Sequence, residues 1–278
     1  MPRLTIVIVT FNSAADIGTC LESIPAAARH TDYDVIVVDN ASADGTAALV
    51  RERWPHVRVV DAGGNLGFAR ANNLGIRATA GELVLLLNPD AVPGDDAIDR
   101  LVAVLDEMPG VAVAGPRIVD EAGRAELSHG AMISPLAELW QKLLTHGHAR
   151  QWPVITARVE RASREASFPD WVSGACLLVR RVSLERAGLL DERYFLYTED
   201  VDLCATVRAN GGLVRFSPEA EVVHARGASR ASSPGPAEQA YRRSQLAFYR
   251  KHHPGWVLIL TLYLKLRGRF PDISRQDR

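Results

Sequence analysis

The stretch that decides the fold is LTIVIVTFNSAADIGTCLESIPAAARHTDYDVIVVDN, residues 4–40. It begins with a continuous aliphatic run at Leu4–Val9, passes through a helix-compatible stretch at Ala14–Ser23 and returns to a second run at Val35–Val38. Aliphatic runs without polar alternation are typical of strands buried on both faces. A strand, a helix and a strand in this order predict a right-handed β-α-β unit with two parallel strands.

The same alternation continues beyond this unit. Further strands are predicted at Val57–Val60, Leu83–Leu87 and Val111–Ala114. Helix-compatible stretches lie at Asp44–Arg53, Phe68–Thr79 and Asp95–Glu107. This pattern predicts an α/β fold, Rossmann-like, with a mostly parallel central sheet flanked by helices.

The rest of the chain is less regular. Residues 116–169 contain four prolines and are predicted to form loops and helices. Further predicted elements are a strand at Ala175–Val179, a helix from near Thr198, and a short strand at Leu213–Phe216. The segment Arg230–Pro236 is rich in Ser, Pro and Gly and is predicted to be a flexible loop.

The composition indicates a globular protein without a general affinity for nucleic acid. Of 278 residues, 47% are hydrophobic and 23% are charged, which is enough apolar material for a sizeable core. The 32 Lys and Arg residues nearly balance 33 Asp and Glu, and the net charge of -1 gives no basic field for a nucleic-acid partner. An anionic ligand would therefore need a local site.

The three cysteines and the start of the chain suggest a cytoplasmic protein. Cys20, Cys176 and Cys204 are widely spaced and form no C-x-x-C pair, which favours reduced, buried thiols over a zinc site. The chain enters a strand almost at once and shows no signal-peptide pattern. We expect a cytoplasmic location.

A short apolar segment near the end of the chain, Trp256–Arg269, allows two interpretations. Its apolar run is too short to cross a hydrocarbon core of about 30 Å. With Lys265, Arg267 and Arg269 beside it, the run could lie on a membrane surface as a peripheral contact. Alternatively, it forms a C-terminal helix that packs on the domain.

Polar or small residues follow each of the first four predicted strands. The segments are Thr10-Phe11-Asn12, Asp39-Asn40-Ala41-Ser42, Asp61-Ala62-Gly63-Gly64-Asn65 and Asn88-Pro89-Asp90. In parallel sheets the carboxyl ends of the strands form the ligand crevice. The chain contains neither G-x-x-x-x-G-K-[ST] nor an intact G-x-G-x-x-G, which disfavours a P-loop kinase and a dinucleotide-binding dehydrogenase.

Five segments carry a resemblance to a known family when they are taken together and in order. They are TIVIVTFNS (5–13), VIVVDNASADGT (35–46), GGNLGFARANNLG (63–75), LLLNPD (85–90) and YTEDVDL (197–203). Over about residues 4–250 the chain resembles family 2 glycosyltransferases with the GT-A fold, and within them bacterial rhamnosyltransferases that extend lipid-linked or cell-surface glycans. The resemblance implies a nucleotide-sugar-binding half at 1–115, an acceptor-binding and catalytic half at 116–255 of the same domain, and a C-terminal amphipathic helix and tail at 256–278.

The resemblance assigns Thr10, Asn12 and Asp39 to the base and ribose of the donor. An ionised Asp39 can accept a hydrogen bond from the imide N–H of uracil or thymine, or from a ribose hydroxyl. Asp39 could instead only end its strand in an Asx turn. Donor-binding roles are likewise implied for Asn65 and Asn72. Alternatively, Asn65 only occupies a left-handed turn position and Asn72 is only a helix-face residue.

A divalent cation, Mg²⁺ or Mn²⁺, is implied by the place of Asn88-Pro89-Asp90 in the family's D-x-D element. Asp90 would bind the cation, which suits hard oxygen ligands and neutralises charge on the leaving diphosphate. Asn88 replaces the first acid of that element. Its amide oxygen can accept a hydrogen bond from a ribose hydroxyl or a metal-bound water, but it adds no negative charge. The family often places a further metal ligand at the position of His224, although a lone histidine is more often structural.

The resemblance implies that Asp200 is the general base, taking the proton from the acceptor hydroxyl as that oxygen attacks the anomeric carbon. Direct attack would invert the anomeric configuration. The alternative is that Glu199, Asp200 and Asp202 only complement the dipole of a helix that begins at Thr198. Gly174 could let a substrate approach the backbone closely.

The function implied is an inverting hexosyltransferase of cell-wall or polysaccharide biosynthesis. Its expected partners are a nucleotide-sugar donor, with dTDP-rhamnose ahead of UDP- and GDP-sugars, and a glycan or lipid-linked sugar acceptor. A nucleotidyltransferase is a weaker alternative, because no Gly-rich basic loop occurs early in the chain. A non-catalytic nucleotide-sugar-binding module is the other alternative, against which the presence of Asp90, Asp200 and His224 argues.

Overall fold

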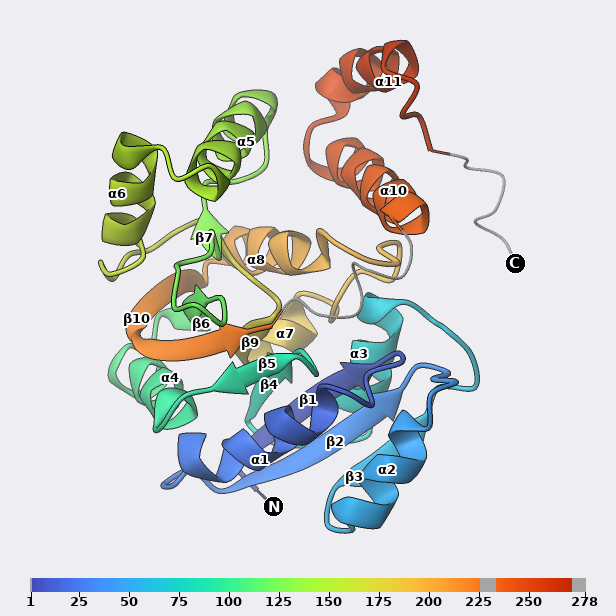
Figure 1. The fold of residues 1–278 in the computed structure, drawn as a ribbon, viewed down its shortest axis with the longest axis vertical. Helices are drawn as coiled ribbons and strands as arrows, with labels where there is room; N and C mark the ends of the chain where they lie inside the picture. Colours follow the sequence, from blue (N-terminus) through green and yellow to red (C-terminus); the bar gives the residue numbers. More distant parts are fainter. Residues whose placement is uncertain (1, 226–233, 272–278) are drawn as a thin grey trace.

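A mixed eight-stranded sheet forms the centre of the protein (Figure 1). The computed structural model describes residues 2–225 and 234–271. In spatial order the strands are β3 (Arg58–Asp61), β2 (Tyr33–Asp39), β1 (Leu4–Thr10), β4 (Leu83–Leu87), β9 (Cys176–Arg180), β6 (Val111–Val119), β10 (Leu213–His224) and β5 (Ala91–Pro93). A separate pair is formed by β7 (His129–Gly130) and β8 (Trp171–Val172).

The predicted α/β fold is confirmed, and the parallel pairing holds best in the first half of the chain. Strands β3, β2, β1 and β4 pair in parallel, as the β-α-β pattern predicts. In the second half β6 and β10 are parallel, whereas β9 runs antiparallel between β4 and β6 and β5 runs antiparallel to β10. The antiparallel β9 therefore joins the two parallel halves of the sheet.

Both faces of the sheet are covered by helices, which explains the continuous aliphatic strands. In β1, Leu4, Ile6 and Ile8 pack in one core cluster, while Val7 and Val9 pack in the cluster on the opposite face. The first face carries α1 (Ile17–Ala27), α2 (Thr46–Arg53) and α4 (Ala97–Glu107); the second carries α3 (Phe68–Arg77), α7 (Arg181–Arg186) and α8 (Glu199–Ala209).

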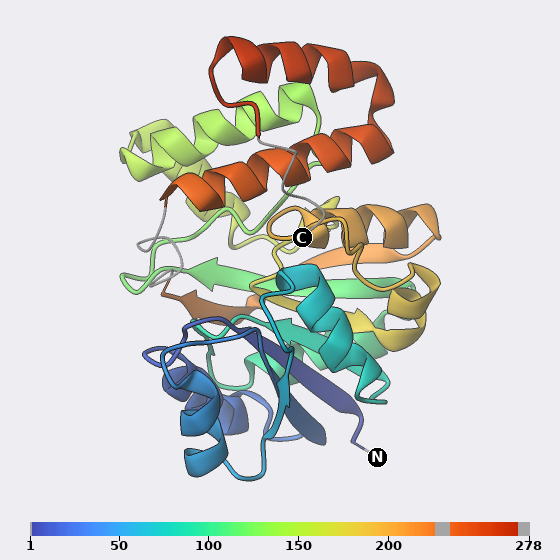
Figure 2. The same ribbon diagram turned by 90° about the vertical axis from the view of Figure 1, so that its right-hand side faces the viewer.

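A group of helices forms the end of the molecule away from α2 and β3 (Figure 2). It consists of α5 (Pro135–Ala149), α6 (Pro153–Ala162), α10 (Pro234–His252) and α11 (Val257–Leu266), with a short 3-10 turn η1 (Pro254–Trp256) before α11. Phe248 and Tyr249 of α10 join the core under the sheet's second face. Within residues 2–225 and 234–271, no helix combines the length and the apolar character needed to cross a bilayer.

Two sequence predictions in the second half were wrong in extent. The strand expected at Leu213–Phe216 continues to His224, because residues 221–223 resume pairing with β6 after an irregularity at Ser217 and then also pair with β5. Of the segment Arg230–Pro236, predicted as a loop, residues 230–233 lie outside the described residues. Pro234–Pro236 belong to α10, since proline is tolerated in a first helical turn.

Candidate functional site

The first two strands end side by side and hold two of the predicted donor-binding residues together. Thr10 and Asp39 are direct partners in the parallel register of β1 and β2. The Thr10 hydroxyl donates to Oδ1 of Asp39 at 3.2 Å, and the backbone N–H of Ser42 donates to Oδ2 at 3.2 Å. Asp39 is buried, and these two donors hold its carboxylate at the carboxyl end of the sheet.

Asn12 ties the loop after β1 to the loop after β2. Its backbone lies in the left-handed region at φ 54°, which asparagine tolerates better than most residues. Its side-chain oxygen accepts from the N–H of Ala43 at 2.7 Å, and its own N–H donates to the Ser42 hydroxyl at 2.9 Å. Thr10, Asn12 and Asp39 thus line one pair of connected loops, and their contact with a nucleotide stays a prediction.

Asn65 belongs to the next loop along this edge of the sheet. Its side-chain oxygen accepts from Nδ2 of Asn40 at 2.9 Å and from the N–H of Gly67 at 3.1 Å. A Cβ atom on Gly67 would collide with the Phe195 carbonyl, to which the N–H of Phe68 donates at 2.7 Å. Residue 67 must therefore be glycine for this loop to reach the segment that precedes α8.

Asn72 is placed differently from the other predicted donor-binding residues. It is 1% exposed, and its Nδ2 donates to the carbonyl of Phe68 one turn earlier in α3. Within the described part of the chain, its side chain makes no hydrogen bond to the loops after β1, β2 or β3. Its role in donor binding stays a prediction.

The predicted metal residues meet at the end of β4. Nε2 of His224 lies 3.1 Å from Oδ1 of Asp90 and 3.4 Å from Nδ2 of Asn88. The backbone explains this meeting, because His224 pairs with Ala91 where β10 and β5 run antiparallel, and the N–H of Ala225 donates to the carbonyl of Asp90 at 3.0 Å. The structure therefore brings Asn88, Asp90 and His224 together from segments 134 residues apart.

A second acid, Glu126, approaches the same imidazole from the other side. Its carboxylate lies 3.6 Å from Nδ1 of His224. Burial lowers the pKa of His224, but the hydrogen bonds and charges of Asp90 and Glu126 outweigh it and raise the pKa to about 9. Without a cation, the two carboxylates thus hold a proton on this ring.

The residues at this corner fit a divalent cation. The side-chain oxygen of Asn88 is buried and has no hydrogen-bond partner among the described residues. Asp90 also raises the pKa of the nearby Asp16 carboxyl, after the larger effect of burial. The corner thus combines negative charge, an unsatisfied amide oxygen and an imidazole nitrogen. These groups suit a cation such as Mn²⁺, which accepts both oxygen and nitrogen ligands.

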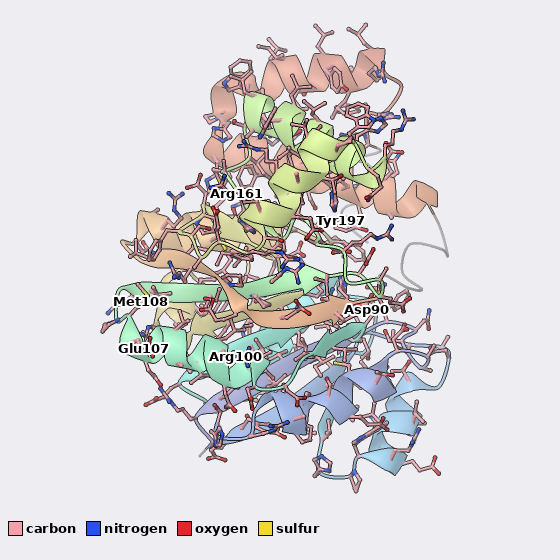
Figure 3. All side chains as sticks on the ribbon, turned by 60° about the vertical axis from the view of Figure 1, so that its left-hand side comes forward. Asp90, Arg100, Glu107, Met108, Arg161 and Tyr197 are labelled. Carbon is pink, nitrogen blue, oxygen red and sulfur yellow. The ribbon has the colours of Figure 1, made fainter. Side chains whose placement is uncertain are left out.

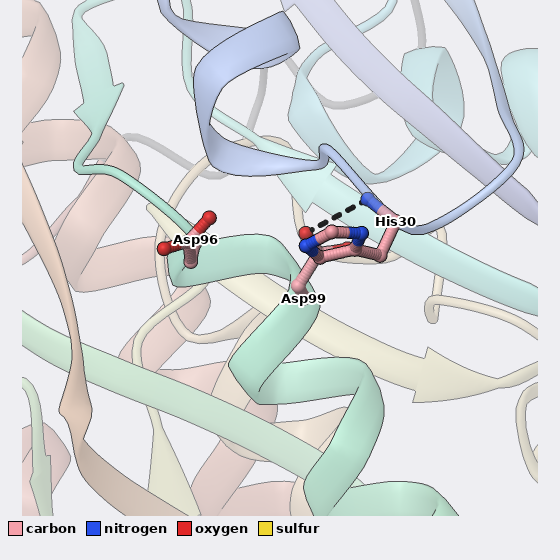
Figure 4. A group of neighbouring side chains, drawn as sticks. All are labelled: His30, Asp96 and Asp99. Carbon is pink, nitrogen blue, oxygen red and sulfur yellow. Dashed lines mark hydrogen bonds between the residues drawn. The ribbon is translucent and has the colours of Figure 1, made fainter.

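Another group with metal-ligating side chains lies elsewhere in the fold (Figure 4). His30 follows α1, and Asp96 and Asp99 lie at the start of α4. Asp99 already accepts hydrogen bonds from the N–H of His30 at 3.0 Å and from the Thr31 hydroxyl at 2.6 Å. These bonds join α1 to α4, and this group shares no residue with the Asp90 corner.

Asp200, the predicted base, lies in the first turn of α8 and is held by backbone groups. Its Oδ2 accepts from the N–H of Gly174 at 2.7 Å, and its Oδ1 accepts from the N–H of Val201 at 2.8 Å. Burial raises the pKa of Asp200, while these two N–H groups lower it. The carboxylate is therefore fixed in position and more basic than an exposed aspartate.

Of the three residues just before Asp200, Tyr197 and Thr198 are strained, and Thr198 and Glu199 are buried. Tyr197 and Thr198 both lie in the left-handed region, at φ 70° and 76°, which is costly for residues with side chains. Thr198 occupies the predicted N-cap position, but its side chain makes no capping bond. Burial, and then the charge of Asp200, raise the pKa of Glu199 well above its usual value, which favours the neutral acid there.

Asp202 fixes α8 against the C-terminal helix α10. It is 2% exposed and accepts hydrogen bonds from the Tyr194 hydroxyl at 3.0 Å, from Nζ of Lys251 at 2.7 Å and from Nε2 of His252 at 2.7 Å. Of the three acids in this turn, Asp202 is thus engaged in packing the helices. Asp200, in contrast, is held by the backbone N–H groups of Gly174 and Val201.

Backbone contacts connect Asp200 to the metal corner. Gly174, which holds Asp200, is followed by Ala175, whose carbonyl accepts from the N–H of Asn88 at 2.9 Å. Asn88 in turn contacts His224. In Figure 3, Asp90 lies at the end of the sheet and Tyr197, three residues before the base, lies toward the C-terminal helices. The residues that fit a cation and the predicted base are therefore linked by backbone hydrogen bonds. Such an arrangement suits a reaction in which a hydroxyl displaces a diphosphate.

Two residues of this framework were missed or assigned otherwise from the sequence. Glu126 lies in an irregular segment that folds back on β6, and no local pattern predicts that its side chain approaches His224. Gly174 was expected to give a substrate room, whereas a Cβ there would lie 3.1 Å from Cβ of Asp200. The glycine therefore makes room for the base itself.

The chain matches a family along nearly all of its length. A family model described as "Glycosyltransferase like family 2" matches residues 2–257. The N-acetylglucosaminyl-diphospho-decaprenol L-rhamnosyltransferase of Mycobacterium tuberculosis is 32% identical over 274 residues, covering 91% of this chain and 86% of that protein. The rhamnosyltransferase WbbL of Escherichia coli K12 is 24% identical over 241 residues, covering 79% and 82% respectively.

A solved structure supports the fold. A mannosyltransferase from Pyrobaculum calidifontis in complex with GDP-Man and Mn²⁺ aligns with a TM-score of 0.62 and 22% identity, over 95% of this chain and 70% of that one. The fold is therefore that of the GT-A glycosyltransferases, as the sequence predicts. With a family match over residues 2–257 and a 32% identical relative covered along most of its length, the chain belongs to the family 2 glycosyltransferases.

Proposed function

We propose that this glycosyltransferase moves rhamnose from dTDP-rhamnose to a hydroxyl of a lipid-linked or cell-surface glycan, with inversion at the anomeric carbon. The similarity to the mycobacterial enzyme, whose name states a diphospho-decaprenol acceptor and an L-rhamnosyl donor group, supports the sugar and the acceptor class. The structural neighbour with GDP-Man keeps GDP-sugars as an alternative donor class, and UDP-sugars form another.

The observation that carries the proposal is the backbone connection of Asp200 to Asn88 through Gly174 and Ala175. It supports a single site in which the base and the metal corner act on one substrate pair. In this proposal residues 1–115 bind the donor and residues 116–255 bind the acceptor and complete catalysis. Residues 256–269 would keep the enzyme at the inner face of the membrane.

Each site residue has one task in the proposed reaction. Thr10, Asn12 and Asp39 hold the base and ribose, and Asn65 and Asn72 orient the donor. Asp90 and His224 would hold Mg²⁺ or Mn²⁺, with Asn88 beside them, and the cation would supply positive charge toward the diphosphate.

Asp200 accepts the proton of the acceptor hydroxyl as its oxygen attacks the anomeric carbon. Its raised pKa supports this role, since a more basic carboxylate is a better proton acceptor. The base leaves the reaction protonated and returns its proton to water, while the nucleoside diphosphate departs. No covalent nucleophile is required.

A thermal-shift panel of dTDP-, UDP- and GDP-sugars with and without Mn²⁺ tests the proposal. A ligand that binds the native state raises Tm according to its affinity. We expect dTDP-rhamnose with Mn²⁺ to give the largest rise in Tm. In a separate transfer assay, we expect the release of dTDP to require an acceptor. A larger shift with a different nucleotide would overturn the donor assignment, and no shift with any nucleotide sugar would overturn the site.

A further inference from the structure

Helix α5 is oriented with its apolar side toward solvent. Leu136 is 80% exposed and Leu139 is 67% exposed, and Trp140 and Leu143 are also exposed. These positions follow the i, i+3, i+4, i+7 spacing that places side chains on one helix face. The charged Glu138, in contrast, is buried. A helix on the surface of a globular protein normally buries the apolar face and exposes the charge.

Polar contacts hold α5 in this orientation. The Glu138 carboxylate accepts two hydrogen bonds from Nε2 of Gln245 in α10, at 2.9 and 2.7 Å, and one from Nζ of Lys142 at 3.2 Å. Gln245 is itself buried. A rotation of α5 that buried its leucines would break these hydrogen bonds. It would therefore destabilise the folded state, because a buried carboxylate needs such partners. The leucines therefore remain outside.

Helix α11 lies at the same end of the molecule as α5 (Figures 1 and 2), and its side chains form a second exposed apolar surface. Leu258 and Leu266 are each 78% exposed, and Ile259 and Leu262 are also exposed. Leu264 is the fully buried side chain of this helix. Together, α5 and α11 expose far more apolar surface than isolated surface leucines do.

A groove of about 800 Å³ runs along α5 on the side of α10. Leu139, Leu143 and Tyr241 of α10 are among the residues that line it. The Tyr241 ring also contacts the ring of Tyr197, with centroids 6.2 Å apart, three residues before the proposed base. The exposed leucines of α5 are thus connected, through Tyr241, to the segment that precedes Asp200.

The charges beside this surface are almost all positive. Residues 135–150 and 254–271 contain five basic side chains, Lys142, Arg150, Lys265, Arg267 and Arg269. Their one acid is the buried, hydrogen-bonded Glu138. Lys142 contacts Glu138 and Arg269 contacts Glu238, whereas the other three form no ion pair with an acid among the described residues. In a chain with a net charge of -1, this local excess favours an anionic surface.

We propose that α5 and α11 together form a face that docks on a membrane containing anionic lipids. The exposed leucines insert between the headgroups, and the flanking basic side chains contact lipid phosphates. The inference extends the proposed contact of residues 256–269 to α5, and it rests on the proposed function in placing the enzyme beside a lipid-linked acceptor. The competing occupant of this face is a second copy of the chain. That copy would bring the same excess of positive charge, so the two faces would not be complementary.

The test is co-sedimentation of the full chain with vesicles, using equal parts phosphatidylglycerol and phosphatidylcholine against phosphatidylcholine alone. We expect binding to the anionic vesicles, weakened by about tenfold or more in each of Leu136→Glu and Leu262→Glu. Val182→Glu is the matched control, because Val182 is 50% exposed on α7, away from this face. All variants should keep the wild-type Tm, since the mutated side chains lie in solvent.

Absence of binding to anionic vesicles would overturn the proposal. So would binding that Leu136→Glu leaves unchanged, or a dimer in size-exclusion chromatography that the same variants dissociate. The vesicles contain no acceptor and no donor. Vesicle binding can therefore fail while nucleotide-sugar transfer is intact, and transfer can fail while vesicle binding persists.

Discussion

The carboxylate of Glu126 lies 3.6 Å from Nδ1 of His224, while Asp90 lies 3.1 Å from Nε2 of the same ring. A carboxylate behind a metal-binding histidine fixes the orientation of the ring and raises its basicity. This arrangement makes Glu126 a positioning residue for the proposed metal ligand His224.

Glu126→Gln should therefore weaken Mn²⁺ binding by about 10-fold to 100-fold, because the amide no longer orients the imidazole as a carboxylate does. The measurement is the Mn²⁺ concentration that gives half of the donor-induced thermal shift. Glu107→Gln is the control, since Glu107 is an exposed acid at the opposite end of the sheet from Asp90 (Figure 3) and the charge change is equal. Equal Mn²⁺ requirements in the two variants would contradict the role of Glu126.

Gly174→Ala should slow turnover while leaving donor binding intact. The added Cβ would lie 3.1 Å from Cβ and 3.4 Å from Oδ2 of Asp200, so the base must shift. Misplacement of a catalytic group by about 1 Å costs on the order of 100-fold in rate, and the shift required here is smaller. We expect a loss of about 10-fold in kcat, measured as release of nucleoside diphosphate.

The control for that variant is Gly255→Ala, where a Cβ meets nothing within 4 Å. The control should retain wild-type kcat. If Gly174→Ala also retained it, the contact between Gly174 and Asp200 would have no part in positioning the base.

The first half of the fold could be predicted from the sequence because its signals are local. The aliphatic runs at β1 and β4 are buried on both faces, and their lengths follow directly from where polar residues begin. The extent of β10 could not be predicted, since its residues 221–224 are held by pairing with β6 and β5, which lie far away in sequence. Local hydrophobic pattern carries no information about such pairing.

The same distinction applies to the site. The Asn88-Pro89-Asp90 and Glu199-Asp200 segments are recognisable as motifs, and the resemblance places His224 with them. Glu126 has no local signal, because only the fold brings it to His224. The orientation of α5 is likewise invisible in its sequence, which by spacing alone predicts that Leu139 and Leu143 are buried.

Asp202→Asn should destabilise the protein by about 2 kcal/mol, because Lys251 keeps its contact with Asp191 but the buried carboxylate that Lys251, Tyr194 and His252 share is lost. The measurement is the free energy of unfolding from urea denaturation. Arg77→Ala, which removes an exposed ion pair with Glu192, should change it by less than about 1 kcal/mol. A comparable small effect for Asp202→Asn would show that the network does not hold α10 to α8.

Because of His129, the free energy of unfolding should decrease as the pH is lowered. Burial lowers its pKa to about 4, and its ring stacks on Phe216 at a centroid distance of 3.8 Å. Between pH 4 and about 6.5 the unfolded chain therefore binds more protons at this residue than the folded chain does. Its contribution to stability is complete above that window and is lost as the pH falls through it.

His129→Phe keeps an aromatic ring beside Phe216 but does not titrate. We expect its Tm to fall less than that of the wild type when the pH is lowered from about 7 to about 5. The comparison uses the difference between the two proteins, so acids common to both cancel. Identical losses of Tm would show that His129 is not responsible.

The most direct test of the whole account is a parallel measurement of donor binding and sugar transfer in Asp200→Asn and Asp90→Asn. Binding is followed by titration calorimetry with dTDP-rhamnose and Mn²⁺, and transfer by release of dTDP in the presence of acceptor. We predict that Asp200→Asn binds the donor like the wild type but loses turnover by at least about 100-fold, whereas Asp90→Asn loses the Mn²⁺-dependent part of binding. Near-normal transfer by Asp200→Asn, or unchanged Mn²⁺-dependent binding by Asp90→Asn, would contradict the account.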